Sequence, residues 1–325
     1  MENPSFKQAV AFITLGMLLI SLNDLIIKKL SGAYPLHQMI FTRAFIGLFF
    51  SLIIVQFEGG FQILRTSRPG LHMVRGLMVF LSNMTYFAAL AVLPLGHATA
   101  LFFISPILIT ALSIPLLGET VGPRRIAAVI MGFVGVFIMM KPHTWRADDV
   151  NAFVFFLPVL AALFYALMQI LTRKLSIGSK PSAMAVYIQM VFITLSLAIG
   201  LVAGGGQYMG LSDNPSLVFI LRPWVWPPLG DMPYFAVLGV MSAGVGYSLS
   251  RAYSCAPAAT VAPFEYVLLP LAILWGWSFF GDIPDMFILI GIVLIVGSGL
   301  YVYIREGQKR VAPLSPSSGA QSRAP

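Results

Sequence analysis

Three ionisable residues interrupt long hydrophobic stretches of the chain, and their side chains could do chemistry there. Asp24, Arg43 and Glu265 each have mainly apolar neighbours in the sequence. Ionisable groups in apolar surroundings are energetically costly and usually serve a function. Such groups could contact a substrate or carry a proton, so these residues are the first candidates for a functional site.

Asp24 and Arg43 are expected at similar depth in two successive helices. Asp24 precedes the turn at Gly32 by eight residues, and Arg43 follows Tyr34 by nine. At about 1.5 Å per residue, both lie roughly 12–13 Å below the same end of the helices. They could pair, either as a structural contact or as a gate for which substrate or proton competes. Alternatively, Asp24 pairs with Lys28, one turn away, and is only interfacial.

Glu265 lies between two prolines, Pro263 and Pro270. Proline frees a backbone carbonyl and opens a helix locally, which membrane helices tolerate where a cavity or a neighbouring helix satisfies the freed group. A carboxylate in this place could take up a proton or contact a cationic or hydroxylated substrate. The alternative is a glutamate that hydrogen-bonds a neighbouring helix for packing alone.

Uncharged polar and aromatic residues complete the candidate site. Asn83 and Tyr86 share a helix face by their three-residue spacing, and Tyr165 precedes Gln169 by one turn. Each such residue could instead serve helix packing, but as a set they predict a mixed aromatic and amide cavity that suits a planar or amphipathic metabolite. The whole candidate set comprises Asp24, Arg43, Asn83, Tyr86, Ser105, Tyr165, Gln169, Gln189, Glu265 and Tyr266.

The composition requires that membrane helices position these residues. Hydrophobic residues make up 58% of the 325-residue chain and charged residues only 10%, whereas soluble domains carry about 25% charge. Long apolar runs without alternation indicate helices rather than a barrel. The sequence predicts an all-α membrane protein with ten spans, at residues 8–30, 34–56, 71–93, 97–117, 122–140, 152–172, 182–204, 232–252, 257–280 and 286–304.

The distribution of Lys and Arg predicts the orientation. An even number of spans puts both termini on one side, and thirteen basic residues then lie on that side against five on the other. The positive-inside rule places both termini in the cytoplasm, and we expect a multi-pass protein of the bacterial inner membrane. Residues 305–325 are rich in Ser, Pro, Gly and Arg, which predicts a disordered cytoplasmic tail.

Several functional classes find no support in the sequence. The net charge of +8 comes from scattered residues rather than a clustered basic face, so no nucleic-acid partner is expected. The single cysteine, the four dispersed histidines and the absence of phosphate-loop, hydrolase or metalloprotease motifs predict no cofactor, no metal and no enzyme. A polytopic membrane enzyme or a receptor remains the alternative to transport.

The two halves of the chain show the same order of landmarks. An offset of 163 residues superposes Pro94 on Pro257, Ala89 on Ala252, Gly118 on Gly281 and Glu119 on Asp282. An offset of 145 superposes Lys29-Leu30-Ser31 on Lys174-Leu175-Ser176 and matches Gln169 to Asp24. We therefore expect two five-helix repeats, residues 8–140 and 152–304. Because five is odd, the repeats have opposite orientation, an arrangement typical of transporters with a site between the halves.

On these landmarks the chain resembles the EamA-type branch of the drug/metabolite transporter (DMT) superfamily. The resemblance rests on the stretches from Pro106 to Gly118-Glu119 and from Pro270 to Gly281-Asp282, each followed by a glycine-containing hydrophobic helix, and it covers residues 8–304. It implies ten helices, cytoplasmic termini and transport of metabolites such as amino acids, nucleotide-derived compounds or vitamins. The stretch around Asn83 is loosely similar to the riboflavin-importer and solute-carrier-35G-like branches.

The second half departs from the family pattern in two places. Asp282 stands where glutamate is usual, and Gln189 corresponds to Arg43, so Arg43 has no symmetric partner. The expected function is secondary transport of a small metabolite by alternating access, with riboflavin or an amino-acid-like compound as substrate. A coupled proton is a possible partner besides the lipid bilayer, and the sequence leaves open whether the protein is a monomer or a homodimer.

Overall fold

The computed structural model describes residues 4–93, 95–140, 152–208, 210, 214–281 and 286–309, and every regular element within these ranges is a helix. The long helices are α1 (Pro4–Leu30), α2 (Leu36–Glu58), α3 (Pro69–Leu90), α6 (Pro123–Met140), α7 (Ala152–Leu175), α8 (Pro181–Ala203), α10 (Met232–Cys255) and α13 (Met286–Lys309). The shorter ones are η1 (Phe61–Leu64), α4 (Leu95–Phe102), α5 (Ser105–Leu117), α9 (Pro215–Leu221), α11 (Ala258–Val261), η3 (Ala262–Val267) and α12 (Leu268–Phe280).

The helices have the length and composition of membrane spans. Seven helical stretches in the described part of the chain are apolar enough and long enough, at 20–25 residues, to cross a bilayer, and α5 is a shorter apolar helix. Many large hydrophobic side chains on their outer surfaces are exposed, among them Phe49, Phe57 and Leu201. The protein is therefore an integral membrane protein whose apolar exterior faces lipid.

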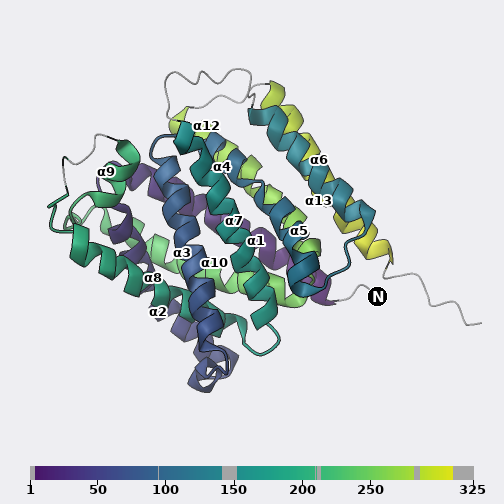
Figure 1. Cartoon of the computed structure of the whole chain (residues 1–325), viewed down its shortest axis with the longest axis horizontal. Helices are drawn as coiled ribbons and strands as arrows, with labels where there is room; N and C mark the ends of the chain where they lie inside the picture. Colours follow the sequence, from purple (N-terminus) through teal and green to yellow (C-terminus); the bar gives the residue numbers. More distant parts are fainter. Residues whose placement is uncertain are drawn as a thin grey trace, which may run out of the picture.

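Helices that are far apart in the sequence pack against each other. α1 packs along α10, α3 along α7, α2 along α8, and α6 along α13. Figure 1 shows α6 and α13 side by side at one end of the molecule and α2 and α8 toward the other. α10 also contacts α2, α7 and α8, so it packs against helices from both the first and the second half of the chain.

Two of the predicted spans are interrupted where they reach the interior. The span predicted at 97–117 is formed by α4 and α5, which are separated at Phe103 and Ile104, and the span predicted at 257–280 consists of α11, η3 and α12. Pro106 and Pro263 lack an N–H, so the carbonyl groups four residues earlier lose their helical partners. The interruptions bring Phe103 and Glu265 into the interior, where both line a cavity.

Glycines end both interrupted spans. Gly118 follows α5 with φ +67° and Gly281 follows α12 with φ +75°, a left-handed conformation that glycine adopts without a Cβ clash. Asp282 and Pro94, two landmarks of the predicted repeat, lie outside the described residues. The last helix extends to Lys309, beyond the predicted boundary at residue 304, and the rest of the predicted tail, 310–325, is also outside the described residues.

Candidate functional site

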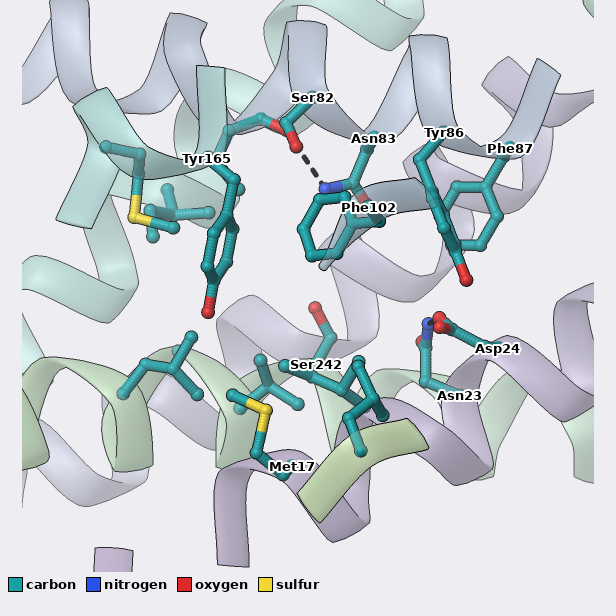
Figure 2. A pocket seen from close by; sticks show the side chains of 18 of the residues that line it. Met17, Asn23, Asp24, Ser82, Asn83, Tyr86, Phe87, Phe102, Tyr165 and Ser242 are labelled. Atoms are coloured by element: carbon teal, nitrogen blue, oxygen red, sulfur yellow. Dashed lines mark hydrogen bonds between the residues drawn. The ribbon is translucent and has the colours of Figure 1, made fainter. Parts of the chain in front are cut away.

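A cavity of about 120 Å³ lies in the interior between helices of both halves of the chain. This volume accommodates several water molecules, since one water needs roughly 10–15 Å³. Figure 2 shows side chains from α1, α3, α7 and α10 pointing into it. Six of the ten residues predicted from the sequence line this cavity: Asp24, Arg43, Asn83, Tyr86, Tyr165 and Glu265.

Arg43 is held by two amides. Its Nη1 donates to Oδ1 of Asn23 at 3.0 Å, and its Nη2 donates to Oδ1 of Asn83. The Asn83 amide is oriented in turn, because its Nδ2 donates to the carbonyl of Val79 at 3.0 Å. The guanidinium also lies over the rings of Phe87 and Phe192, at 5.7 and 5.5 Å from the ring centres. Arg43 is therefore fixed in place by neutral groups.

Asp24 lies near Arg43 but is separated from it by an amide. The two charges attract each other electrostatically, yet Asp24 accepts a hydrogen bond from Nδ2 of Asn23 at 3.4 Å, and Arg43 donates to the other end of that amide. The Tyr86 hydroxyl points toward Asp24 in Figure 2 and hydrogen-bonds Oγ1 of Thr99 at 2.9 Å. The direct pair that the sequence allowed is thus replaced by an amide-bridged one.

Lys28, the alternative partner considered for Asp24, contacts the end of α3. Its Nζ donates to the carbonyls of Leu90 and Leu93, both at 3.1 Å. These carbonyls lie at the C-terminal end of α3, where a cation is favourable. Asp24 is 5% exposed, so it belongs to the buried cavity wall rather than to the interface.

Glu265 is surrounded by hydroxyl and amide donors. Its Oε1 accepts from the hydroxyls of Tyr253 at 2.5 Å and Tyr165 at 3.0 Å, and from Nε2 of Gln169 at 3.5 Å. Nε2 of Gln169 also donates to the Tyr165 hydroxyl at 2.7 Å. Within the described part of the chain, no cation hydrogen-bonds this carboxyl. Gln169 does not line the cavity, but it donates hydrogen bonds to Tyr165 and Glu265, which do.

The remaining predicted residues lie elsewhere. The Tyr266 hydroxyl donates to the carbonyl of Val129 on α6 at 3.2 Å, so its ring points away from the cavity. Ser105 is fully buried in α5 and is not on the cavity wall. Nε2 of Gln189 donates to Oγ of Ser242 at 3.0 Å. Ser242 lines the cavity, whereas Gln189 does not.

Sequence reasoning missed several residues of the site. Asn23, Ser242 and Tyr253 carry no charge, and nothing in the sequence distinguishes them from packing residues. Arg75 had a signal, an arginine at the fifth residue of the span predicted at 71–93, but its position near the span boundary hid its depth. It is 1% exposed and lines the cavity.

Arg75 connects four helices. From α3, its Nε donates to Oγ1 of Thr172 on α7 at 2.6 Å, its Nη1 to the carbonyl of Met184 on α8 at 2.9 Å, and its Nη2 to Oγ of Ser250 on α10 at 2.9 Å. With all three nitrogens bonded to the second half of the chain, Arg75 is a structural contact on the cavity wall.

Comparison with known proteins identifies relatives that match most of the chain. The sequence model of the EamA-like transporter family matches residues 7–141. The S-adenosylmethionine uptake transporter of Rickettsia prowazekii (strain Madrid E) is 26% identical over 304 residues, which cover 93% of this chain and 94% of the relative. The riboflavin transporter of Vibrio cholerae serotype O1 is 32% identical over 251 residues, 76% of each chain.

A solved structure has the same fold. A crystal structure with 18% sequence identity superposes with a TM-score of 0.70 and covers 96% of this chain and 100% of its own. At this identity the likeness concerns the fold alone.

Proposed function

This chain belongs to the EamA-like transporter family of metabolite transporters, and we propose that it is a secondary transporter that works by alternating access to the cavity described above. The observation that carries the proposal is the cavity itself, with charged groups from both halves of the chain on its wall. Asp24 and Arg43 come from the first half and Glu265 from the second. Charged groups in the interior of a membrane protein typically mark a translocation pathway.

Helix boundaries support two five-helix repeats, residues 8–140 and 152–304. Helices α3, α4, α5 and α6 begin at Pro69, Leu95, Ser105 and Pro123, and α10, α11, α12 and α13 begin 163 residues later at Met232, Ala258, Leu268 and Met286. α2 and α8 begin and end 145 residues apart. The difference between the two offsets is an insertion that contains α9. With α4 and α5 counted as one span, and α11, η3 and α12 as another, the helices outside this insertion support ten spans in two inverted repeats.

The proposed orientation has both termini in the cytoplasm of a bacterial cell, with the protein in the inner membrane. The thirteen-to-five distribution of basic residues supports it. The ends of α2, α5 and α10 and the beginnings of α8 and α11 then lie at the cytoplasmic side. The turn between α1 and α2 and the segment around α9 lie outside.

The proposed substrate is a small amphipathic metabolite, either a vitamin such as riboflavin or an amino-acid-like compound. The aromatic wall, with Tyr86, Phe102 and Tyr165, supports a ligand with a planar part. The charges of Asp24 and Arg43 support a ligand with ionised groups. Among the relatives, one is named as a riboflavin transporter and another as an S-adenosylmethionine uptake transporter.

Glu265 is the proposed site of a coupled proton. Its hydrogen bonds come from hydroxyl and amide groups that can serve either protonation state of the carboxyl, and they all reach one oxygen. The other oxygen remains available for a proton. A carboxyl that binds a proton from one side and releases it to the other would couple transport to a proton gradient.

Uptake by liposomes that contain the purified protein tests these proposals. We expect saturable uptake of one labelled vitamin, amino acid or nucleoside, acceleration by an imposed pH gradient, and loss of uptake in the variants Arg43→Ala and Glu265→Ala. Thr194→Ala, on the exposed surface of α8, is the matched control. If both cavity variants transported normally while remaining folded, the assignment of the site would be wrong. A Glu265→Gln variant that still responded to the gradient would exclude Glu265 as the proton site.

A further inference from the structure

We propose that the substrate is a zwitterion, whose carboxylate binds Arg43 and whose cationic group binds Asp24. This inference rests on the proposed transport function and narrows its substrate. It favours a compound with an amino-acid-type head group over a neutral compound such as a flavin. The argument depends on how the two charges are held on the cavity wall.

Arg43 presents a cation whose charge no neighbouring carboxylate neutralises by direct contact. Both of its terminal nitrogens donate to the amide oxygens of Asn23 and Asn83, which are neutral. Its Nε is buried and has no hydrogen-bond partner among the described residues. A guanidinium has five N–H donors in a fixed planar arrangement that matches a carboxylate. An anionic group in the cavity would supply the acceptor that Arg43 lacks.

Asn23 keeps Asp24 and Arg43 apart. The side-chain oxygen of Asn23 faces Arg43 at 3.0 Å, and its nitrogen faces Asp24 at 3.4 Å. An arginine and a carboxylate at similar depth would otherwise form a bidentate pair with each other. The amide therefore maintains two separate and opposite charges on one region of the wall. A ligand with an acidic and a basic group a short distance apart could satisfy both.

A neutral ligand fits this arrangement less well. It would displace water from the cavity and leave both charges buried without ionic partners, which is energetically costly. The aromatic residues Phe102, Phe103 and Tyr165 on the same cavity wall would receive the apolar or planar body of a zwitterion. The cavity thus combines a site for the head group and a site for the body of the substrate.

Three related ligands test the head group separately from the body. S-adenosylmethionine carries the complete amino-acid head, and decarboxylated S-adenosylmethionine lacks only the carboxylate. 5′-Methylthioadenosine lacks the head and the sulfonium charge but keeps the adenosine. Binding of each ligand to the purified wild-type protein is measured by calorimetry, together with L-methionine, L-phenylalanine and riboflavin. We expect the zwitterions to bind, and S-adenosylmethionine to bind at least roughly tenfold more tightly than the two truncated ligands.

Two variants locate the contacts. Arg43→Gln should weaken binding of S-adenosylmethionine by at least roughly tenfold and leave binding of the decarboxylated compound within about twofold. Asp24→Asn should weaken binding of S-adenosylmethionine and of its decarboxylated form, which both carry an aliphatic ammonium group. It should leave the affinity for 5′-methylthioadenosine unchanged. Thr194→Ala is the control that should change nothing, and thermal unfolding of each variant establishes that it is folded.

Several results would overturn the inference. One is the absence of binding by any zwitterion, whether or not riboflavin binds. Another is an equal loss of affinity for S-adenosylmethionine and for decarboxylated S-adenosylmethionine in Arg43→Gln. The proposed transport function fails separately. Saturable uptake of riboflavin that Arg43→Gln leaves intact would preserve transport and reject the zwitterion. Binding of S-adenosylmethionine without uptake of any compound would support the zwitterion and reject transport.

Discussion

The carboxylate of Glu119 accepts the backbone N–H of Ala258 at 2.9 Å, across 139 residues of sequence. Its second oxygen accepts the N–H of Ala259 at 3.1 Å. Glu119 follows the left-handed Gly118 at the end of α5 and thereby caps the beginning of α11, whose first N–H groups have no partner within the helix. Arg173 lies 3.8 Å from the same carboxylate and donates to the carbonyls of Tyr253 and Ser254. The Gly-Glu pair therefore holds together the ends of α5, α7 and α10.

Replacing Glu119 should open this end of the bundle. We expect Glu119→Ala to increase the rate at which a maleimide labels Cys255, the single cysteine, which is half-buried at the end of α10. Loss of the cap frees two N–H groups, and a severalfold increase in labelling follows from a cost of about 1–2 kcal/mol. Mass spectrometry of the labelled protein measures the rate.

Glu58 provides the matched control for Glu119. It also caps a helix of the other half, because its Oε2 accepts the N–H of Ser182 at the beginning of α8 at 3.0 Å. Glu58→Ala should destabilise the protein without changing the labelling of Cys255 as much. Equal labelling rates in the two variants would contradict a local role of Glu119.

Tyr34 connects the first turn of the chain to the beginning of α10. Its hydroxyl donates to Oδ2 of Asp231 at 2.6 Å, and burial together with this carboxylate raises the pKa of Tyr34 to about 12. The pKa in the folded protein lies above the unfolded value, so the stabilisation is complete below about pH 10 and is lost as the pH rises through about 12. Tyr34→Phe should lower the free energy of unfolding by about 1 kcal/mol. The loss should be the same at pH 6 and pH 8 in thermal unfolding, and a difference between these pH values would show that another group titrates.

Arg75 should be essential for stability rather than for substrate specificity. Arg75→Gln removes donors to Thr172, Met184 and Ser250 and leaves these buried acceptors unsatisfied. We expect a loss of at least about 3 kcal/mol in the free energy of unfolding. Thermal unfolding in detergent measures it, and Arg75→Lys should restore little, since one ammonium group cannot reach three acceptors on three helices. A stable Arg75→Gln protein with altered ligand preference would instead make Arg75 a binding residue.

Gly132 is expected to tolerate no side chain. A Cβ at this position would lie 2.4 Å from the Tyr266 ring, so Gly132→Ala must displace the ring and break its hydrogen bond to Val129. Such overpacking costs about 1–3 kcal/mol. Gly297→Ala on α13 is the matched control, because no atom lies within 4 Å of its Cβ, and alanine favours a helix. Equal unfolding temperatures in the two variants would contradict close packing at Gly132.

The sequence predicted the helices and the charged part of the site better than the rest. Asp24, Arg43 and Glu265 were recognisable because an ionisable side chain in an apolar stretch is energetically costly and usually serves a function. The prediction that Tyr266 lies on the cavity wall is wrong. Adjacent residues in a helix point in different directions, and here Glu265 points into the cavity while Tyr266 points toward Val129. Tyr253 could not be found because its role depends on the path of η3, which places Glu265 beside it. The bridging role of Asn23 likewise depends on the three-dimensional position of Arg43.

The hydrogen-bond networks around Arg43 and around Glu265 lie in different halves of the chain. Within the described residues, the side chains of Asn23, Arg43 and Asn83 form hydrogen bonds only among α1, α2 and α3. Those of Tyr165, Gln169, Tyr253 and Glu265 form hydrogen bonds only among α7, α10 and η3. Each network can therefore travel as a rigid unit with its own half. A relative displacement of the halves would alter the spacing and exposure of the two networks while every hydrogen bond inside each of them stays intact. The energetic cost of such a movement would fall on contacts that cross the two halves, among them the donors of Arg75, the hydrogen bond from Ser82 to the carbonyl of Ala161, and the contact of Arg43 with the ring of Phe192.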